Sequence, residues 1–292
     1  MKVETEHRYH SGDRPAIAYR RWRPPASTDR LPLVLLHGAA SNLTRWSEFV
    51  ADTRLTAERE ILRLDLRGHG RSIDRGPTSL ETWADDIAGI LDTEGIDRAV
   101  LLGHCLGASV AVTFAARHPA RTGGLILIEP TMHAALTGTL GRVRRFAPLL
   151  HVLIGGVRAL NRLGLHRRAL DSLDLRALDQ AFRARLSEPG GRAALEARYA
   201  SVREDLRVMP TAAYLQDVVE TVRPLPLERV RAPALVLLSN ARTFADAGRT
   251  RSELSRLAGA DVQTIDAAHW IPTERPREMR AAIEGWLARV GL

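Results

Sequence analysis

Short segments of strand length, most of them largely apolar, recur along this 292-residue chain and alternate with segments of helical spacing. A strand that is apolar on both faces has to be covered on both faces, which a parallel sheet between two helical layers achieves. The alternation therefore predicts an α/β fold with a mostly parallel, doubly wound sheet. The predicted strands are Leu31–Leu36, Ile61–Leu66, Ala99–Gly103, Gly124–Glu129, Ala234–Ser239 and Asp261–Asp266.

The strand rhythm is interrupted once. From about Thr131 to Leu225 the apolar residues keep helical spacing, and no strand-like run appears. We therefore predict one core domain built from residues 1–130 and 226–292, with an all-helical insert at residues 131–225. The segment Arg8–Trp22 predicts two short strands around a Gly-Asp turn.

The single cysteine lies in the pentapeptide Gly103-His104-Cys105-Leu106-Gly107, between a predicted strand and a predicted helix. In a G-x-nucleophile-x-G turn the central residue takes unfavourable backbone angles, and small flanking residues let the strand and helix approach. A helix N-terminus and a nearby histidine lower the pKa of a thiol. We interpret Cys105 as a nucleophile; the alternative is a small buried apolar residue.

Four motifs in this order give the chain a resemblance to the α/β-hydrolase-fold superfamily. Leu36–Trp46 resembles the oxyanion-hole loop, Asp65–Ser72 the D-x-R-G-x-G-x-S turn, the pentapeptide the nucleophile elbow, and Asp266–Pro272 the loop that carries the catalytic histidine. The resemblance implies that the helical insert is a cap over the active site. The chain departs from the family in its sulfur, since most relatives carry serine at the elbow.

The resemblance also implies roles for individual residues. His269 becomes the catalytic base, and the backbone N–H groups of Ala39 and Leu106 become the oxyanion hole. We expect the side chain of His104 to point away from the site and pack along the turn, and His37 to be structural.

The acid of the triad is left open between two residues. Most relatives place an aspartate after the strand that follows the cap, but here that strand is followed by SNARTFADAGR, with Arg242 near the expected position and Asp246 further on. Asp246 could equally cap the next helix. Glu129 follows the strand after the elbow helix, where some relatives, haloalkane dehalogenases among them, carry their acid. Glu129 is slightly favoured, and a Cys–His pair could act without a strong third member because the thiol is already acidic.

A sulfur nucleophile predicts covalent acyl chemistry on an ester, lactone or thioester, because its acyl-thioester intermediate suits transfer as well as hydrolysis. The predicted substrate is a small acyl or polyketide-like molecule of specialised metabolism, with a carrier-protein or CoA thioester as a further option. Two alternatives stand beside it: conjugate addition or carbon–carbon bond formation by the thiolate, and a receptor-like binding protein without turnover.

Pocket residues are expected among small and aromatic side chains of the loops and cap: Gly38, Trp46, Met132, His133, Tyr214 and Trp270. No G-x-G-x-x-G stands after a strand, no P-loop appears, and no cluster has metal-ligand spacing, so the sequence predicts neither cofactor nor metal.

The formal net charge of +8 comes almost wholly from arginine, since Lys2 is the only lysine. The arginines are interleaved with acids and lack stacking aromatics, which argues against nucleic acid as a partner. The insert carries 15 arginines against 9 acids, a net +6 that weakly favours an anionic substrate. With no apolar signal region, no run long enough to span a bilayer and one cysteine, we expect a cytoplasmic protein with no membrane partner; the oligomeric state stays open.

Overall fold

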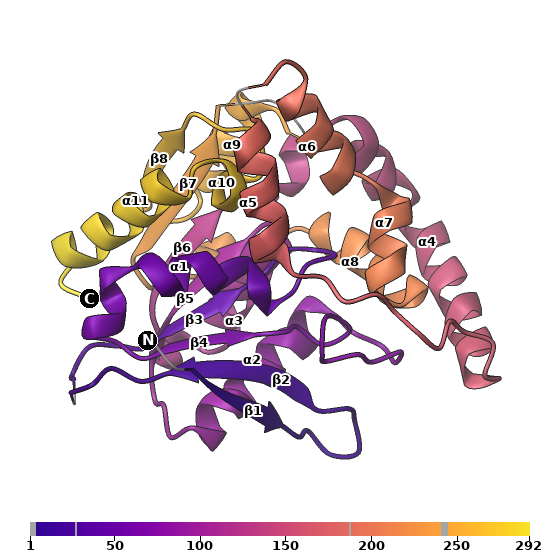
Figure 1. The fold of residues 1–292 in the computed structure, drawn as a ribbon, viewed down its shortest axis with the longest axis horizontal. Helices are drawn as coiled ribbons and strands as arrows, with labels where there is room; N and C mark the ends of the chain where they lie inside the picture. The colour runs from indigo at the N-terminus through magenta and orange to yellow at the C-terminus, as the bar shows by residue number, and fades with distance from the viewer. Residues whose placement is uncertain (1–3, 27, 187, 241–244) are drawn as a thin grey trace.

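The computed structural model describes residues 4–26, 28–186, 188–240 and 245–292. Its described residues form one eight-stranded sheet in the order β1-β2-β4-β3-β5-β6-β7-β8, with helices on both faces (Figure 1). The first two pairings, β1 with β2 and β2 with β4, are antiparallel, and the pairings from β4 to β8 are parallel. This confirms the α/β fold with a mostly parallel sheet.

The strands end where the sequence pattern ends, within a few residues. Their bounds are β1 Thr5–Tyr9, β2 Ile17–Trp22, β3 Leu33–Leu36, β4 Ile61–Leu64, β5 Ala99–His104, β6 Thr122–Ile128, β7 Ala234–Ser239 and β8 Asp261–Ile265. The predicted strand Ile61–Leu66 is two residues too long. After Leu64 the chain turns, and the Asp65 carboxylate accepts hydrogen bonds from the backbone N–H groups of Leu43 and Arg71, at 2.7 and 2.8 Å.

Alternation along β3 shows how one strand supplies both layers of the core. Val34 and Leu36 belong to the apolar cluster under the helices α2 and α3, whereas Leu33 and Leu35 belong to the cluster under α1 and α11. Successive side chains of a strand point to opposite faces, so the whole run is buried. The helices of the two layers and the C-terminal connections are α1 Ser47–Asp52, α2 Leu80–Thr93, α3 Leu106–Arg117, α9 Ala247–Leu254, α10 Ile271–Glu274 and α11 Pro276–Arg289.

Five helices lie between β6 and β7, and no strand occurs among the described residues of that segment. We call residues 131–225 the cap segment. Figure 1 draws its helices together on the side of the molecule away from both termini. They are α4 Gly138–Arg162, α5 Leu175–Arg185, α6 Gly191–Tyr199, α7 Val202–Val208 and α8 Thr211–Thr221. None of the described helices is both long enough and apolar enough to cross a membrane.

The strand and the helix approach closely at the β5–α3 junction. A Cβ added to Gly103 would lie 2.2 Å from the backbone oxygen of Gly107, and one added to Gly107 would lie 2.4 Å from the backbone oxygen of Leu36. Backbone atoms cannot yield as a flexible side chain can. Both flanking positions of the pentapeptide therefore require glycine.

Gly103→Ala should lower the free energy of unfolding by at least about 3 kcal/mol, because the methyl group forces the strand and helix apart. The matched control is Gly285→Ala in α11, where nothing lies within 4 Å of the added Cβ. That control should be stabilised by about 0.5–1 kcal/mol. Urea denaturation followed by circular dichroism measures both, and equal stability of the two variants would contradict the crowding seen at the junction.

Candidate active site

Cys105 stands at the turn between β5 and α3 with strained backbone angles, φ 52° and ψ −115°. A positive φ is costly for a residue with a side chain and persists only where the surroundings hold it. Here the Cys105 backbone N–H donates to the Ile128 carbonyl oxygen at 2.9 Å, and the glycines of the junction leave room for the turn. The thiol is thereby placed at the N-terminus of α3, in the wall of a cavity.

His269 connects the thiol to a carboxylate. Its Nδ1 lies 3.1 Å from Oε2 of Glu129, and its ring also hydrogen-bonds the Cys105 side chain, which leaves Nε2 for the sulfur. Glu129 follows β6 with a φ of 50°, a second strained position. The other oxygen of Glu129 accepts a hydrogen bond from the backbone N–H of Ser239 at the end of β7. The carboxylate is therefore fixed between two adjacent strand ends.

Asp246, the other candidate acid, lies elsewhere. It caps α9, and its side chain accepts a hydrogen bond from the backbone N–H of Arg249 at 2.8 Å. Arg242, which stands near the usual position of the family acid, is outside the described residues. Of the two acids, the structure brings only Glu129 to His269.

The pKa values of the pair shift in opposite directions. Burial raises the pKa of the Cys105 thiol, but the hydrogen bond and charge of His269, together with the Leu106 amide and the Thr131 hydroxyl, lower it below its ordinary value. Burial lowers the pKa of His269, while its contacts with Cys105 and Glu129 raise it to about 10. Both shifts favour the thiolate–imidazolium form of the pair over the neutral thiol and imidazole.

The loop after β3 passes directly over the elbow. A Cβ on Gly38 would lie 3.4 Å from the Cβ of Cys105 and 3.2 Å from Nδ1 of His104, so the backbone approaches as closely as a side chain would allow. Ala39 follows in the cavity wall, and the Leu106 amide already faces the sulfur. The two backbone groups expected to form an oxyanion hole thus belong to segments on either side of Cys105.

His104 does not point away from the site, as we expected from the sequence. It lies in the cavity wall, with its ring centroid 5.3 Å from that of His269 and its Nε2 3.3 Å from the His269 carbonyl oxygen. The expectation was wrong because the loop carrying His269 folds back over the end of β5. Burial, followed by the charge of His269, holds the pKa of His104 well below its ordinary range, so its ring is neutral.

The His269 loop is held by its own neighbours. Both carboxylate oxygens of Glu274 accept from the backbone N–H of Ala268, at 3.0 and 3.1 Å. Nε of Arg275 donates to the Asp266 carbonyl oxygen at 2.9 Å. These contacts fix the loop on both sides of His269 and pre-organise the imidazole.

A cavity of about 620 Å³ opens above the thiol, between the core and the cap segment. Among the predicted pocket residues, Gly38, Tyr214 and Trp270 line this cavity. The other three do not, and their prediction was wrong. Trp46 packs with Phe49 in the core, Met132 is buried in the opposite apolar cluster, and Nδ1 of His133 is 2.6 Å from the Val222 carbonyl oxygen.

Three cavity residues carry chemistry that the sequence analysis missed. Thr131 hydrogen-bonds the Cys105 side chain through its hydroxyl. Asp205, on α7, has its pKa raised to about 7, first by burial and then by the nearby charges of Asp217 and Glu204. Arg45 reaches the cavity from the turn before α1. Of the three, only Arg45 lay in a recognised motif, the loop at Leu36–Trp46.

Among the described residues, no group of three or more His, Cys, Asp or Glu side chains has the geometry of a metal site. The groups gathered at Cys105 are a thiol, an imidazole, a carboxylate and backbone amides. Such a set performs nucleophilic attack and proton transfer.

Comparison with known proteins identifies the family of the chain. The sequence profile of the alpha/beta hydrolase family matches residues 33–282. The chain belongs to that family. In structure it resembles a hydrolase from Pseudomonas aeruginosa PA01 (TM-score 0.66, 23% identity, 99% of each chain) and an enol-lactonase from Burkholderia xenovorans LB400 (TM-score 0.68, 21% identity, 96% of this chain and 99% of the other).

Relatives in sequence include hydrolases and an acyltransferase. A Mus musculus sn-1-specific diacylglycerol lipase is 24% identical over 261 residues, which cover 88% of this chain and 80% of that protein. A Homo sapiens (lyso)-N-acylphosphatidylethanolamine lipase is 35% identical over 118 residues, 36% of this chain and 32% of that lipase. A Sus scrofa 1-acylglycerol-3-phosphate O-acyltransferase is 34% identical over 108 residues, 35% of this chain and 30% of that enzyme. The last two matches thus span only about a third of each relative.

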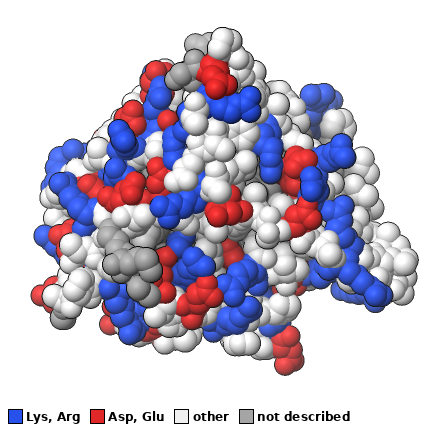
Figure 2. All heavy atoms as spheres, in the orientation of Figure 1, with Lys and Arg blue, Asp and Glu red and all other residues white. Residues whose placement is uncertain are grey.

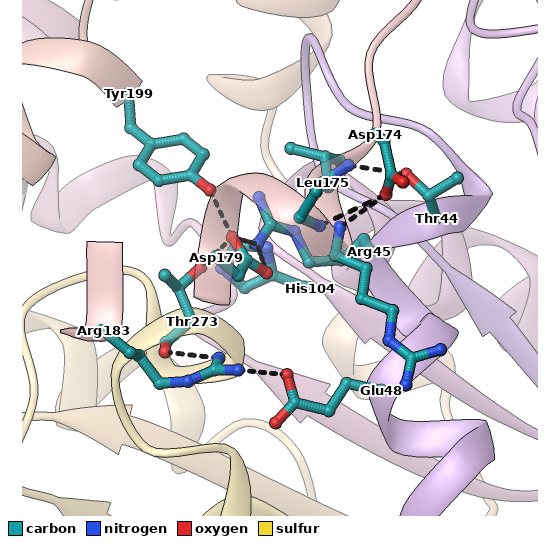
Figure 3. A network of polar contacts seen from close by, with 12 residues as sticks. Thr44, Arg45, Glu48, His104, Asp174, Leu175, Asp179, Arg183, Tyr199 and Thr273 are labelled. Atoms are coloured by element: carbon teal, nitrogen blue, oxygen red, sulfur yellow. Dashed lines mark hydrogen bonds and ion pairs between the residues drawn. The ribbon is translucent and has the colours of Figure 1, made fainter. Parts of the chain in front are cut away.

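A buried polar network joins the cap segment to the core of this hydrolase-family chain (Figure 3). One nitrogen of Arg45 donates to both carboxylate oxygens of Asp179, at 2.8 and 2.6 Å, and to the hydroxyl of Thr273 at 2.6 Å. Asp179 comes from α5, and Thr273 from α10, directly after the His269 loop. The hydroxyl of Tyr199, on α6, also donates to Asp179. The network therefore holds the cap segment beside the His269 loop.

Asp179→Ala should lower the free energy of unfolding by about 3–5 kcal/mol, because it leaves the Arg45 charge buried without a partner. The matched control is Asp171→Ala, which breaks the exposed pair of Asp171 with Arg207 at 2.7 Å. That loss should be about 1 kcal/mol or less. Chemical denaturation measures both, and an Asp179→Ala variant as stable as its control would contradict the role given to this network.

Proposed function

We propose that this protein is an acyl-transferring enzyme that uses Cys105 as its nucleophile on a carboxylic ester, lactone or thioester. The observation that carries the proposal is the line from Glu129 through His269 to Cys105 at the foot of the cavity. The set has the parts of a nucleophile–base–orienting-acid triad, with sulfur in place of oxygen.

In the first half-reaction the Cys105 thiolate attacks the substrate carbonyl carbon and forms a carbon–sulfur bond. The carbonyl electron pair moves to its oxygen, and the N–H groups of Leu106 and Ala39 stabilise the resulting oxyanion. When the tetrahedral intermediate collapses, the bond to the leaving group breaks and His269 gives that group its proton. The products are an acyl thioester on Cys105 and a free alcohol or thiol.

In the second half-reaction neutral His269 takes a proton from water or another acceptor, which attacks the thioester carbonyl. Collapse of this intermediate expels the Cys105 thiolate and restores the imidazolium. The Glu129 side chain holds the ring so that the nitrogen facing the sulfur can carry the proton. Because the leaving group is a thiolate already stabilised by its surroundings, acceptors other than water can compete for the acyl group.

The cavity supports an apolar acyl or polyketide-like substrate. Its wall over the thiol includes Leu136, Leu140 and Val143 from the cap segment and Val218 from α8. A volume of about 620 Å³ suits a drug-sized ligand. The lipase and acyltransferase names of the relatives point to acyl groups as well. A CoA or carrier-protein thioester, in specialised metabolism, is a donor within the same proposal.

Intact-protein mass spectrometry tests the proposal directly, because Cys105 is the only thiol in the chain. The protein is exposed briefly to p-nitrophenyl esters, acyl N-acetylcysteamine thioesters, lactones and a Michael acceptor, beside Cys105→Ala. We expect a mass gain equal to the acyl group, absent from the variant. A gain equal to the whole Michael acceptor, with no acyl adduct, would instead assign conjugate addition.

Ligand-dependent thermal stabilisation without adduct or turnover would contradict the proposal and favour a receptor-like binding protein. If Cys105→Ala turns over the acyl donor as fast as the wild type does, the result would contradict the role of the Cys105 sulfur as nucleophile. A rapid-quench time course detects the acyl-enzyme even if it is short-lived.

The two acids provide a matched pair of variants. Glu129→Gln should slow acylation of Cys105 at least about tenfold, because the carboxylate no longer orients and stabilises the imidazolium. Asp246→Asn should leave the rate unchanged, since an asparagine side chain still accepts a hydrogen bond at the N-terminus of α9. Rates follow from the mass of the adduct against time, and the opposite order of effects would move the acid to Asp246.

A further inference from the structure

Exposed apolar side chains gather in one part of the molecule. Ten large apolar residues are exposed among those that the structure describes, and seven of them lie within residues 146–165, on α4 and the segment after it. They are Phe146, Leu149, Val152, Leu153, Leu160, Leu163 and Leu165, each 49–75% exposed. Clustering of exposed apolar side chains marks a surface that contacts another molecule or a membrane.

The helix α4 has two apolar faces. Leu140 and Val143 face the cavity, and Ile154, further along the same face, is buried. The opposite face carries Phe146, Leu149, Leu153, Leu160 and Leu163 at spacings of three, four, seven and three residues, which place them in one stripe. We call this stripe the outer face of α4. A helix that needed only to cover the cavity would carry polar residues there.

The charge around the outer face has one sign. Residues 138–170 contain seven arginines and no aspartate or glutamate. Within the described part of the chain, no carboxylate lies within ion-pair distance of any of them. Arg142, Arg145, Arg162, Arg167 and Arg168 are exposed. Figure 2 shows blue and white atoms along the edge where Figure 1 draws α4, far from both termini.

We propose that the outer face of α4 docks the protein on the surface of a bilayer that contains anionic lipids. Leucine and phenylalanine side chains enter the boundary between headgroups and acyl chains, while the surrounding arginines lie at the level of the lipid phosphates. A helix of 25 residues is about 37 Å long and lies flat in such an interface. Stable attachment to a bilayer requires two contributions. Here they are the attraction of the arginines to anionic lipids and the burial of the apolar side chains.

The charge pattern selects this partner over a second copy of the chain. Pairing of two outer faces would bring the exposed arginines of two copies together with no acid in residues 138–170, and like charges oppose association. Nucleic acid would satisfy the arginines but would leave the apolar stripe in water. An anionic bilayer satisfies both. Because the inner face of α4 lines the cavity, docking would also place the cavity wall against the membrane.

The test is flotation of the full chain with vesicles. Vesicles of phosphatidylcholine with about a third phosphatidylglycerol should carry the protein, and vesicles of phosphatidylcholine alone should carry much less. High salt should release most of the bound protein, since it screens the arginines. The readout needs no catalysis, so Cys105→Ala should float as the wild type does; failure of the proposed acyl chemistry leaves this result standing.

Variants of the outer face decide whether α4 is responsible. Leu149→Ser with Leu153→Ser should abolish flotation, and Arg145→Gln with Arg168→Gln should weaken partitioning by about tenfold. The controls remove the same kinds of group elsewhere: Val262→Ser with Val290→Ser, both at exposed positions, and Arg229→Gln with Arg277→Gln, which lower the net charge equally. Circular dichroism confirms that each variant is folded.

Flotation that is lost with the outer-face variants and kept in the controls supports the proposal. Three outcomes would overturn it: no flotation with anionic vesicles, flotation unchanged by the outer-face variants, or equal loss in the controls. Another result would assign the outer face to a second copy of the chain. In that case light scattering would show a wild-type dimer, the double variant Leu149→Ser with Leu153→Ser would be monomeric, and the wild type would not bind vesicles.

Discussion

The contact between His269 and Cys105 is the interaction on which the rest of the site depends. A buried thiol is normally a weak nucleophile because burial favours its neutral form. Here the imidazole, the Leu106 amide and the Thr131 hydroxyl outweigh burial and lower the thiol pKa. The imidazolium in turn depends on Glu129, whose carboxylate accepts from the Ser239 amide and contacts Nδ1 of His269.

The fold keeps these groups in place through strain and tight packing. Cys105 and Glu129 both have positive φ angles, and they stand at the ends of the adjacent parallel strands β5 and β6. Gly103 and Gly107 let α3 start against the sheet, so that the sulfur lies at a helix N-terminus. The cap segment adds the cavity roof and is tied to the catalytic loop by Arg45, Asp179 and Thr273.

Local patterns predicted the sheet, because a short apolar run such as Leu33–Leu36 by itself indicates a strand that is buried on both faces. The pentapeptide and the late loop likewise singled out Cys105 and His269. The acid stayed open because Glu129 and His269 are 140 residues apart, and only the sheet brings together the segments that follow β6 and β8. Trp46 was expected in the pocket and lies in the core, whereas His104 was expected to point away and lines the cavity. A motif does not reveal toward which side a side chain points. Asp179 and Asp205 carry no local signal, since their environment comes from tertiary packing.

Titration of the Cys105 thiolate by its ultraviolet absorbance, with Cys105→Ala as the blank, tests the central claim most directly. A lowered thiol pKa predicts that the thiolate forms below the ordinary thiol pKa of about 8.5 and is lost only as the pH falls through the lowered pKa. His269→Ala should move this transition upward, because burial then acts without the opposing imidazolium. A thiolate that forms only at or above the ordinary value, at the same pH in both proteins, would contradict the claim that His269 activates Cys105.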